Sequence, residues 1–140
     1  MQGADNRQMS DTSLPVLPVM RAADLLPLAA AASVAPCPRC AAISARGWES
    51  VPGGFDRKAL EAVGTLRPNS DDEPTLQEHH PAGTNAWSPD APISPLHFPY
   101  NRCEVWRCIA CRRPFLRYTE YGGYCVEERI RPLSGELVVT

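Results

Sequence analysis

The chain has 140 residues, a formal net charge of −2 and a pI of about 5.9, with 15 prolines, six cysteines and 7% aromatic residues. This length provides one small domain with one hydrophobic core, and the nearly balanced charge excludes the strongly basic composition of a generic nucleic-acid binder. No uninterrupted apolar run reaches the length of a membrane-spanning helix, so no membrane partner is expected.

Residues 1–36 are expected to form a flexible or partly helical leader. They contain four prolines, many polar residues and an alanine-rich run. Residues 20–32 are the helical candidate, because Asp24 and the leucines that follow it would place one apolar face on a core. Pro27 is then tolerated if it lies in the first turn of that helix. An extended tail is the alternative for this segment.

The apolar stretch 25–35 is the nearest approach to an export signal. It starts too far from the N-terminus, follows Asp24, contains Pro27 and would leave Pro36 after the cleavage site. The cysteines are also grouped in close pairs, which is unlike a secreted disulfide framework. A reducing cytoplasm is therefore the expected location.

Residues 37–67 begin with a cysteine pair, and residues 43–51 alternate loosely enough to form a strand. A Pro-Gly-Gly sequence then ends that strand. A short helix is expected over residues 56–64, because Asp56 is a good cap, the apolar residues recur at helical spacing and Gly64 lies near the end.

Residues 68–99 carry seven prolines, five acidic residues and neither lysine nor arginine, which is typical of a linker. The segment also contains large apolar side chains that are costly to leave in water, among them Trp87, Ile93, Leu96 and Phe98. A long proline-rich loop wrapped over the domain is therefore expected, and a free linker is the alternative.

Residues 101–140 predict a three-stranded antiparallel sheet. A first strand leads into Cys108, residues 114–121 form the second, and residues 124–131 alternate as the third. Gly122 and Gly123 between the last two strands supply a two-residue turn with positive φ.

Four of the six cysteines form two CxxC pairs, Cys37 with Cys40 and Cys108 with Cys111. Two intervening residues let a tight turn direct both thiolates at one point, and two such turns supply the four ligands of one tetrahedral zinc ion. A closed site of this kind has no open coordination position for water, so the zinc is expected to be structural and the chain is not expected to be an enzyme. A redox dithiol is the alternative use of a CxxC pair.

Two CxxC knuckles, with the second on a β-hairpin that packs against a third strand, resemble the zinc-ribbon superfamily. The resemblance covers residues 37–45 and 103–132. It implies a small α+β, zinc-ribbon-like domain over residues 37–140, in which residues 43–102 are an insertion between the knuckles.

The chain departs from the ribbon pattern at two points. Ala41 and Arg112 stand where ribbon knuckles usually have glycine, because the backbone needs room there. Sixty-seven residues also separate Cys40 from Cys108, so the insertion is expected to determine what this member does.

The remaining cysteines and the histidines have weaker interpretations. With a turn at residues 122–123, Cys125 pairs near Glu120 at the hairpin tip, roughly 30 Å along the strands from the second knuckle. It therefore cannot share the zinc. Cys103 is expected to be a small buried or half-exposed thiol. The histidines are expected to be solvated loop side chains without a second metal; they are His79, His80 and His97.

The candidate partner-binding residues are arginines and aromatic residues around the second knuckle and the hairpin tip: Trp106, Arg112, Arg113, Tyr118, Tyr121 and Tyr124. Aromatic side chains and arginine are enriched in the anchors of protein interfaces. The sequence therefore predicts a structural-zinc protein that acts as a protein-interaction adaptor or accessory factor. Nucleic-acid binding by the same arginines and rings is the alternative, and the net charge of −2 disfavours it.

Overall fold

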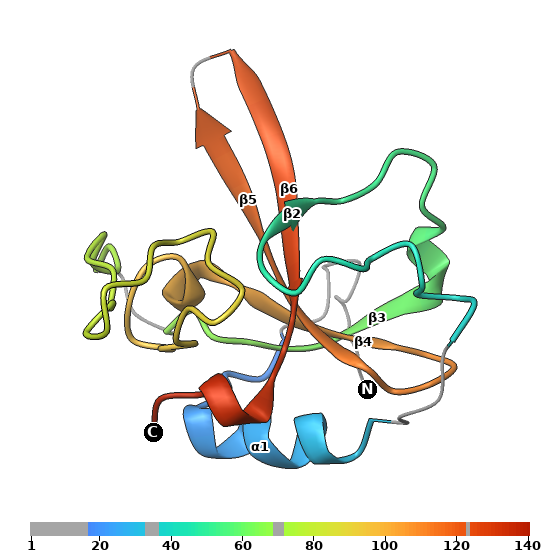
Figure 1. The fold of residues 1–140 in the computed structure, drawn as a ribbon, viewed down its shortest axis with the longest axis horizontal. Coiled ribbons are helices and arrows are strands. Elements are labelled where there is room, and N and C mark those ends of the chain that lie inside the picture. The colour runs from blue at the N-terminus through green and yellow to red at the C-terminus, as the bar shows by residue number, and fades with distance from the viewer. Residues whose placement is uncertain (1–16, 33–36, 69–71, 123) are drawn as a thin grey trace, which may run out of the picture.

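The structure, a computed structural model, describes residues 17–32, 37–68, 72–122 and 124–140. These residues form a small α+β fold with one α-helix, α1 (Ala22–Ala30), and one antiparallel sheet. The sheet has five strands in the order β2-β6-β5-β4-β3, so the expectation of three strands is wrong (Figure 1). The bounds of the strands are Glu49–Ser50 for β2, Leu60–Thr65 for β3, Glu104–Cys108 for β4, Pro114–Gly122 for β5 and Cys125–Pro132 for β6.

The two additional strands come from the segment that was expected to be an insertion. β2 pairs with β6, and β3 pairs with β4. The segment between the two cysteine pairs is therefore part of the same sheet, and strands β4, β5 and β6 form its centre.

The helix expected over residues 56–64 is wrong. Asp56 does cap a turn, because its carboxylate accepts a hydrogen bond from the Lys58 N–H at 3.1 Å, but this turn is a 3₁₀ helix, η1 (Arg57–Ala59), which β3 follows directly. Pairing with β4 outweighs the local helical spacing. Gly64 does not end a helix. It lets the Met20 side chain approach the main chain of β3 closely, since a Cβ at position 64 would lie 2.5 Å from Met20 Sδ.

The β5–β6 hairpin turns one residue later than the sequence indicates. Gly122 pairs with Cys125, so Cys125 does not lie opposite Glu120, which pairs with Glu127 instead. The expected and observed registers differ by two residues. A shift of two keeps every side chain on its own face of the sheet, so the alternation of apolar and polar residues cannot distinguish the two registers.

The sheet is covered on both faces. Consecutive residues of β5 point to opposite faces, and Phe115 and Leu116 accordingly belong to two different apolar clusters. The larger cluster includes Leu25 of α1, which is fully buried although Pro27 lies inside the helix and beyond its first turn. The smaller cluster contains Cys40 and Cys108. No helix in the described part of the chain is long and apolar enough to cross a membrane.

The described part of the proline-rich loop, residues 72–99, packs on the domain, and a second 3₁₀ helix, η2 (Tyr100–Arg102), follows it. Ile93 is fully buried in the larger cluster. Arg131 of β6 is also fully buried and donates hydrogen bonds to the hydroxyl of Tyr100 at 2.8 Å and to the carbonyl of Pro89 at 3.3 Å. A buried guanidinium therefore holds the loop against the sheet through neutral acceptors.

Replacing this guanidinium should loosen the loop. Arg131→Met leaves the carbonyl of Pro89 and the hydroxyl of Tyr100 buried without their donor, so the free energy of unfolding should fall by about 1–3 kcal/mol. Urea denaturation measures the change, and the exposed Arg46→Met is the control. Equal stability of the two variants would contradict the assigned role of Arg131.

Glu128 predicts an acid-sensitive contribution to stability. Partial burial acts to raise the pKa of Glu128, but the guanidinium groups of Arg117 and Arg57 outweigh it and hold this pKa below its usual range. The stabilisation is therefore complete above the unfolded-state pKa, about 4.3, and is lost as the pH falls through the lower folded-state value. Between about pH 5 and pH 2, Glu128→Gln should lose less stability than the wild type.

Candidate metal centre

The two cysteine pairs lie on turns that main-chain hydrogen bonds define. In the first, the Ile43 N–H donates to the carbonyl of Cys40 at 3.0 Å. In the second, the Arg112 N–H donates to the carbonyl of Cys108 at 2.9 Å, and the Cys108 N–H donates to the carbonyl of Arg113 at 2.9 Å. Cys108 is the last residue of β4, and Cys111 lies in the turn that leads to β5.

Arg112, which directly follows Cys111, has an unusual backbone conformation. Its φ is +67°, in the left-handed region that a non-glycine residue adopts only at a cost of roughly 1–2 kcal/mol.

The structure brings the four predicted ligands together. All four Sγ atoms of Cys37, Cys40, Cys108 and Cys111 lie within 4.8 Å of one another. The Cys37 and Cys108 sulfurs are 3.8 Å apart, and those of Cys40 and Cys111 are 3.6 Å apart. Tetrahedral coordination with bonds of about 2.3 Å places the ligand sulfurs about 3.8 Å apart, so the cluster has the dimensions of a site for one metal ion.

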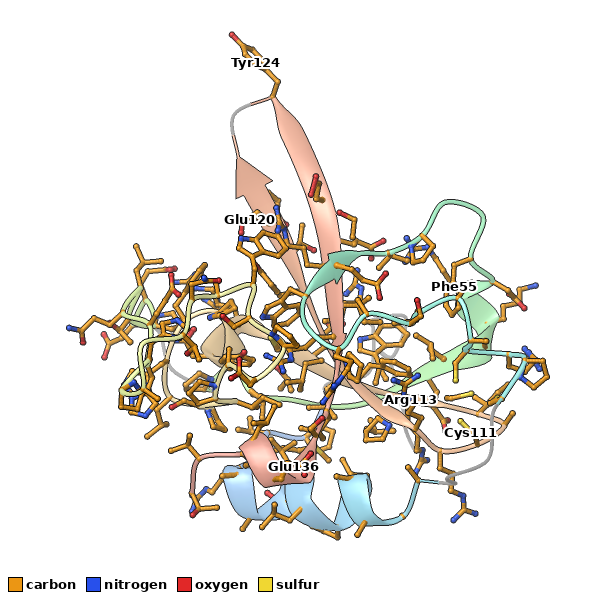
Figure 2. All side chains as sticks on the ribbon, in the orientation of Figure 1. Phe55, Cys111, Arg113, Glu120, Tyr124 and Glu136 are labelled. Carbon is orange, nitrogen blue, oxygen red and sulfur yellow. The ribbon has the colours of Figure 1, made fainter. Side chains whose placement is uncertain are left out.

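The surrounding side chains fix this cluster. Cys40 and Cys108 are buried in the smaller apolar cluster with Ile43, Phe115 and Ile130. A guanidinium joins the two knuckles, because Arg113 packs over the Phe115 ring and donates to the carbonyl of Ile43 at 3.3 Å. Figure 2 shows Cys111 and Arg113 on the same side of the molecule, far from Tyr124 at the hairpin tip.

The thiols differ in their readiness to ionise. Burial raises the pKa of Cys37, but hydrogen bonds from the main chain of Cys40 and Arg39 outweigh it and bring the pKa down to about 7. Burial, followed by the proximity of Cys111 and Cys108, raises the pKa of Cys40 to about 12. Four adjacent thiolates repel one another, so a bound cation must displace protons and is favoured as the pH rises.

Neither Cys103 nor the histidines belong to this site. Cys103 is fully buried in the larger cluster, and its thiol donates to the carbonyl of Pro99 at 3.3 Å. His79 stacks on His97, and His80 contacts Glu78. Within the described residues, no other group of three or more potential ligands comes together. The side chain of Cys125 lies outside the described part of the structure.

The candidate partner residues are placed in three different environments. Tyr118 is buried against the Trp48 ring and therefore belongs to the core. Trp106 is half-buried under the guanidinium of Arg117, and Arg113 is occupied by the contacts described above. The exposed candidates are Arg112, Tyr121 and Tyr124.

Comparisons with models of protein families, with curated proteins and with solved structures find no match to this chain. The case for a metal therefore rests on the four sulfurs, their spacing and their burial. Four thiols without a carboxylate form a donor set that suits a soft or borderline metal ion.

Loss of one thiol should abolish metal binding. Cys108→Ser should reduce the bound metal from about one ion per chain to almost none and should unfold much of the domain, because metal-binding free energy is folding free energy in such a site. Native mass spectrometry with and without a chelator measures both effects. Cys103→Ser, a buried thiol outside the cluster, should keep its metal, and equal loss in both variants would refute the assignment.

Proposed function

We propose that this protein is a protein-interaction adaptor whose fold is held by one structural zinc ion on Cys37, Cys40, Cys108 and Cys111. Four thiolates at tetrahedral spacing support zinc, and such a closed site joins distant segments without offering a position for catalysis. A reducing compartment such as the cytoplasm would keep these thiols available for the metal.

The projecting β5–β6 hairpin carries the proposal for an adaptor. β4 pairs with β5 only as far as Arg117, so the hairpin extends alone beyond the body of the molecule (Figure 1). Its exposed large side chains are Tyr121, Tyr124 and Val126, at 78%, 107% and 65% relative exposure. Figure 2 shows Tyr124 at the far end. Aromatic residues gathered at the end of a projecting element are typical of protein-binding surfaces.

The charges favour a protein partner over nucleic acid. Near the metal cluster, Arg107 pairs with Glu61 at 2.9 Å and Arg39 pairs with Asp56 at 3.5 Å, so own-chain carboxylates occupy arginines that would contact phosphates. Residues 118–128 at the hairpin contain three glutamates and no lysine or arginine. An acidic tip repels a phosphate backbone.

The thiol redox alternative is weaker for a geometric reason. A redox CxxC pair acts through two cysteines with a depressed pKa on the attacking thiol. Here each cysteine has its short sulfur contact with a cysteine of the other pair. Shared ligation of one ion therefore accounts for both pairs together.

Site-specific crosslinking tests the adaptor function. A photo-crosslinking residue in place of Tyr124, in the full chain and in the cells that produce it, should join covalently to a second protein. The same residue in place of Leu26 on α1, at the opposite end of the molecule (Figure 1), should not. The double variant Tyr121→Ser, Tyr124→Ser should keep its metal and lose the captured protein. Absence of a crosslink at position 124 would count against an adaptor.

A further inference from the structure

The β5 edge of the hairpin presents main-chain groups that form no hydrogen bond with a neighbouring strand among the described residues. The Val51 N–H donates to the carbonyl of Glu128, so Glu128 directs its main chain away from β5. Thr119 lies opposite Glu128, and Tyr121 lies opposite Val126. In an antiparallel pair of strands, every second pair of opposed residues forms no hydrogen bonds with each other. Both residues of such a pair direct their N–H and C=O groups away from the partner strand. Thr119 and Tyr121 therefore point their main-chain groups toward the side where β4 has already ended.

A cleft lies beside this edge. It encloses about 240 Å³, and its lining includes Thr119 and Tyr121 of β5 together with the arginines Arg67, Arg102 and Arg117. Among the described residues that line the cleft, Glu104 is the one carboxylate, so these residues carry an excess of positive charge. The acidic side chains of the hairpin do not line it.

The Glu73 carboxylate is held only weakly by two of these arginines, although Arg102 itself also donates a hydrogen bond to the carbonyl of Pro74 at 2.9 Å. Arg117 is occupied, because it pairs with Glu104 at 3.1 Å and with Glu128. Arg67 and Arg102, by contrast, share the carboxylate of Glu73 at the long distances of 3.7 and 3.6 Å, and the Glu73 side chain is 78% exposed. Exposed ion pairs of this kind contribute at most about 1 kcal/mol, so another carboxylate can displace Glu73.

We propose that the β5 edge binds an extended acidic segment of another protein. The segment adds as a strand beside Thr119 and Tyr121, whose free N–H and C=O groups supply its main-chain hydrogen bonds. One of its carboxylates replaces Glu73 on Arg67 and Arg102. This proposal rests on the adaptor function and specifies the chemistry of the partner, with Glu73 acting as an internal competitor for the cationic end of the cleft.

A second copy of the chain fits this edge poorly. If two copies paired their β5 edges in antiparallel fashion through these two residues, Thr119 of one copy would lie opposite Tyr121 of the other. This register would therefore set the two copies of Glu120 directly opposite each other. Like charges at opposed positions destabilise a pair of strands. Nucleic acid could offer phosphates to these arginines, but it lacks the peptide N–H and C=O groups that would pair with the edge of β5.

Three synthetic peptides test the proposal on the full, metal-loaded chain. They alternate threonine with glutamate, glutamine or lysine, and NMR follows the main-chain amide signals and their hydrogen exchange. The glutamate peptide should bind most tightly, in a salt-dependent manner, and should protect the amides of Thr119 and Tyr121 from exchange. N-methylation of alternate peptide amides should abolish binding, because it removes the main-chain donors.

Two substitutions should change the affinity in opposite directions. Glu73→Gln removes the internal competitor and should tighten binding of the glutamate peptide about two- to fivefold. Arg67→Gln removes a ligand for the peptide carboxylate and should weaken binding by a similar factor of about two to five. Exposed residues elsewhere provide matched controls, and Glu136→Gln and Arg46→Gln should leave the affinity unchanged.

Several results would overturn the proposal. They are equal binding of the three peptides, protection confined to other amides, and the same direction of change for Glu73→Gln and Arg67→Gln. Concentration-dependent protection of Thr119 and Tyr121 without peptide would make a second copy the occupant, and a single-stranded oligonucleotide that shifts the same amides would make nucleic acid the ligand. A crosslinked protein at position 124 together with no peptide effect on β5 would leave the adaptor function standing while refuting strand addition.

Discussion

The cluster of four sulfurs is the constraint on which the rest of this small fold depends. The smaller apolar cluster has five buried members, and two of them are Cys40 and Cys108. On one face of the sheet, thiols therefore fill part of the core that several aliphatic side chains would fill in a larger domain. Thiols that repel one another when ionised pack stably around a bound cation. Bonds to such a cation would join a turn near residue 40 to a turn near residue 110, and so would fix the ends of a segment that contributes β2 and β3 to the sheet.

Arginines perform the second structural task. Only 7% of the residues are aromatic, and the described part of the proline-rich segment, residues 72–99, contains no helix or strand of its own. Arg131 holds that segment through the Pro89 carbonyl and the Tyr100 hydroxyl, and Arg113 holds the first knuckle through the Ile43 carbonyl. A guanidinium is suited to this role because its five donors reach several acceptors at once. These two guanidinium groups therefore form contacts inside the molecule.

The sequence predicted the group of four cysteines better than the fold around it. CxxC spacing is a local signal with few alternative explanations, and it placed all four sulfurs correctly. The order of β4, β5 and β6 also followed from local alternation. Residues 60–65 were misassigned because a short apolar segment satisfies helical and extended spacing alike, and only its pairing with β4 decides. The approach of Arg67 and Arg102 to Thr119 is a long-range contact that leaves no local pattern.

The separation of the hairpin from both apolar clusters has an evolutionary consequence. Tyr118 and Ile130 are the last residues of β5 and β6 that belong to a cluster, and the described residues between them, toward the tip, contribute to neither. Substitutions at the exposed tip residues Tyr121, Tyr124 and Val126 would change the proposed recognition surface while leaving the free energy of folding nearly untouched. On the proposed function, binding specificity and most of the stability would be encoded by different residues of the same two strands. Such a scaffold can acquire new partners by point mutation without passing through unfolded intermediates, provided that the four cysteines are kept.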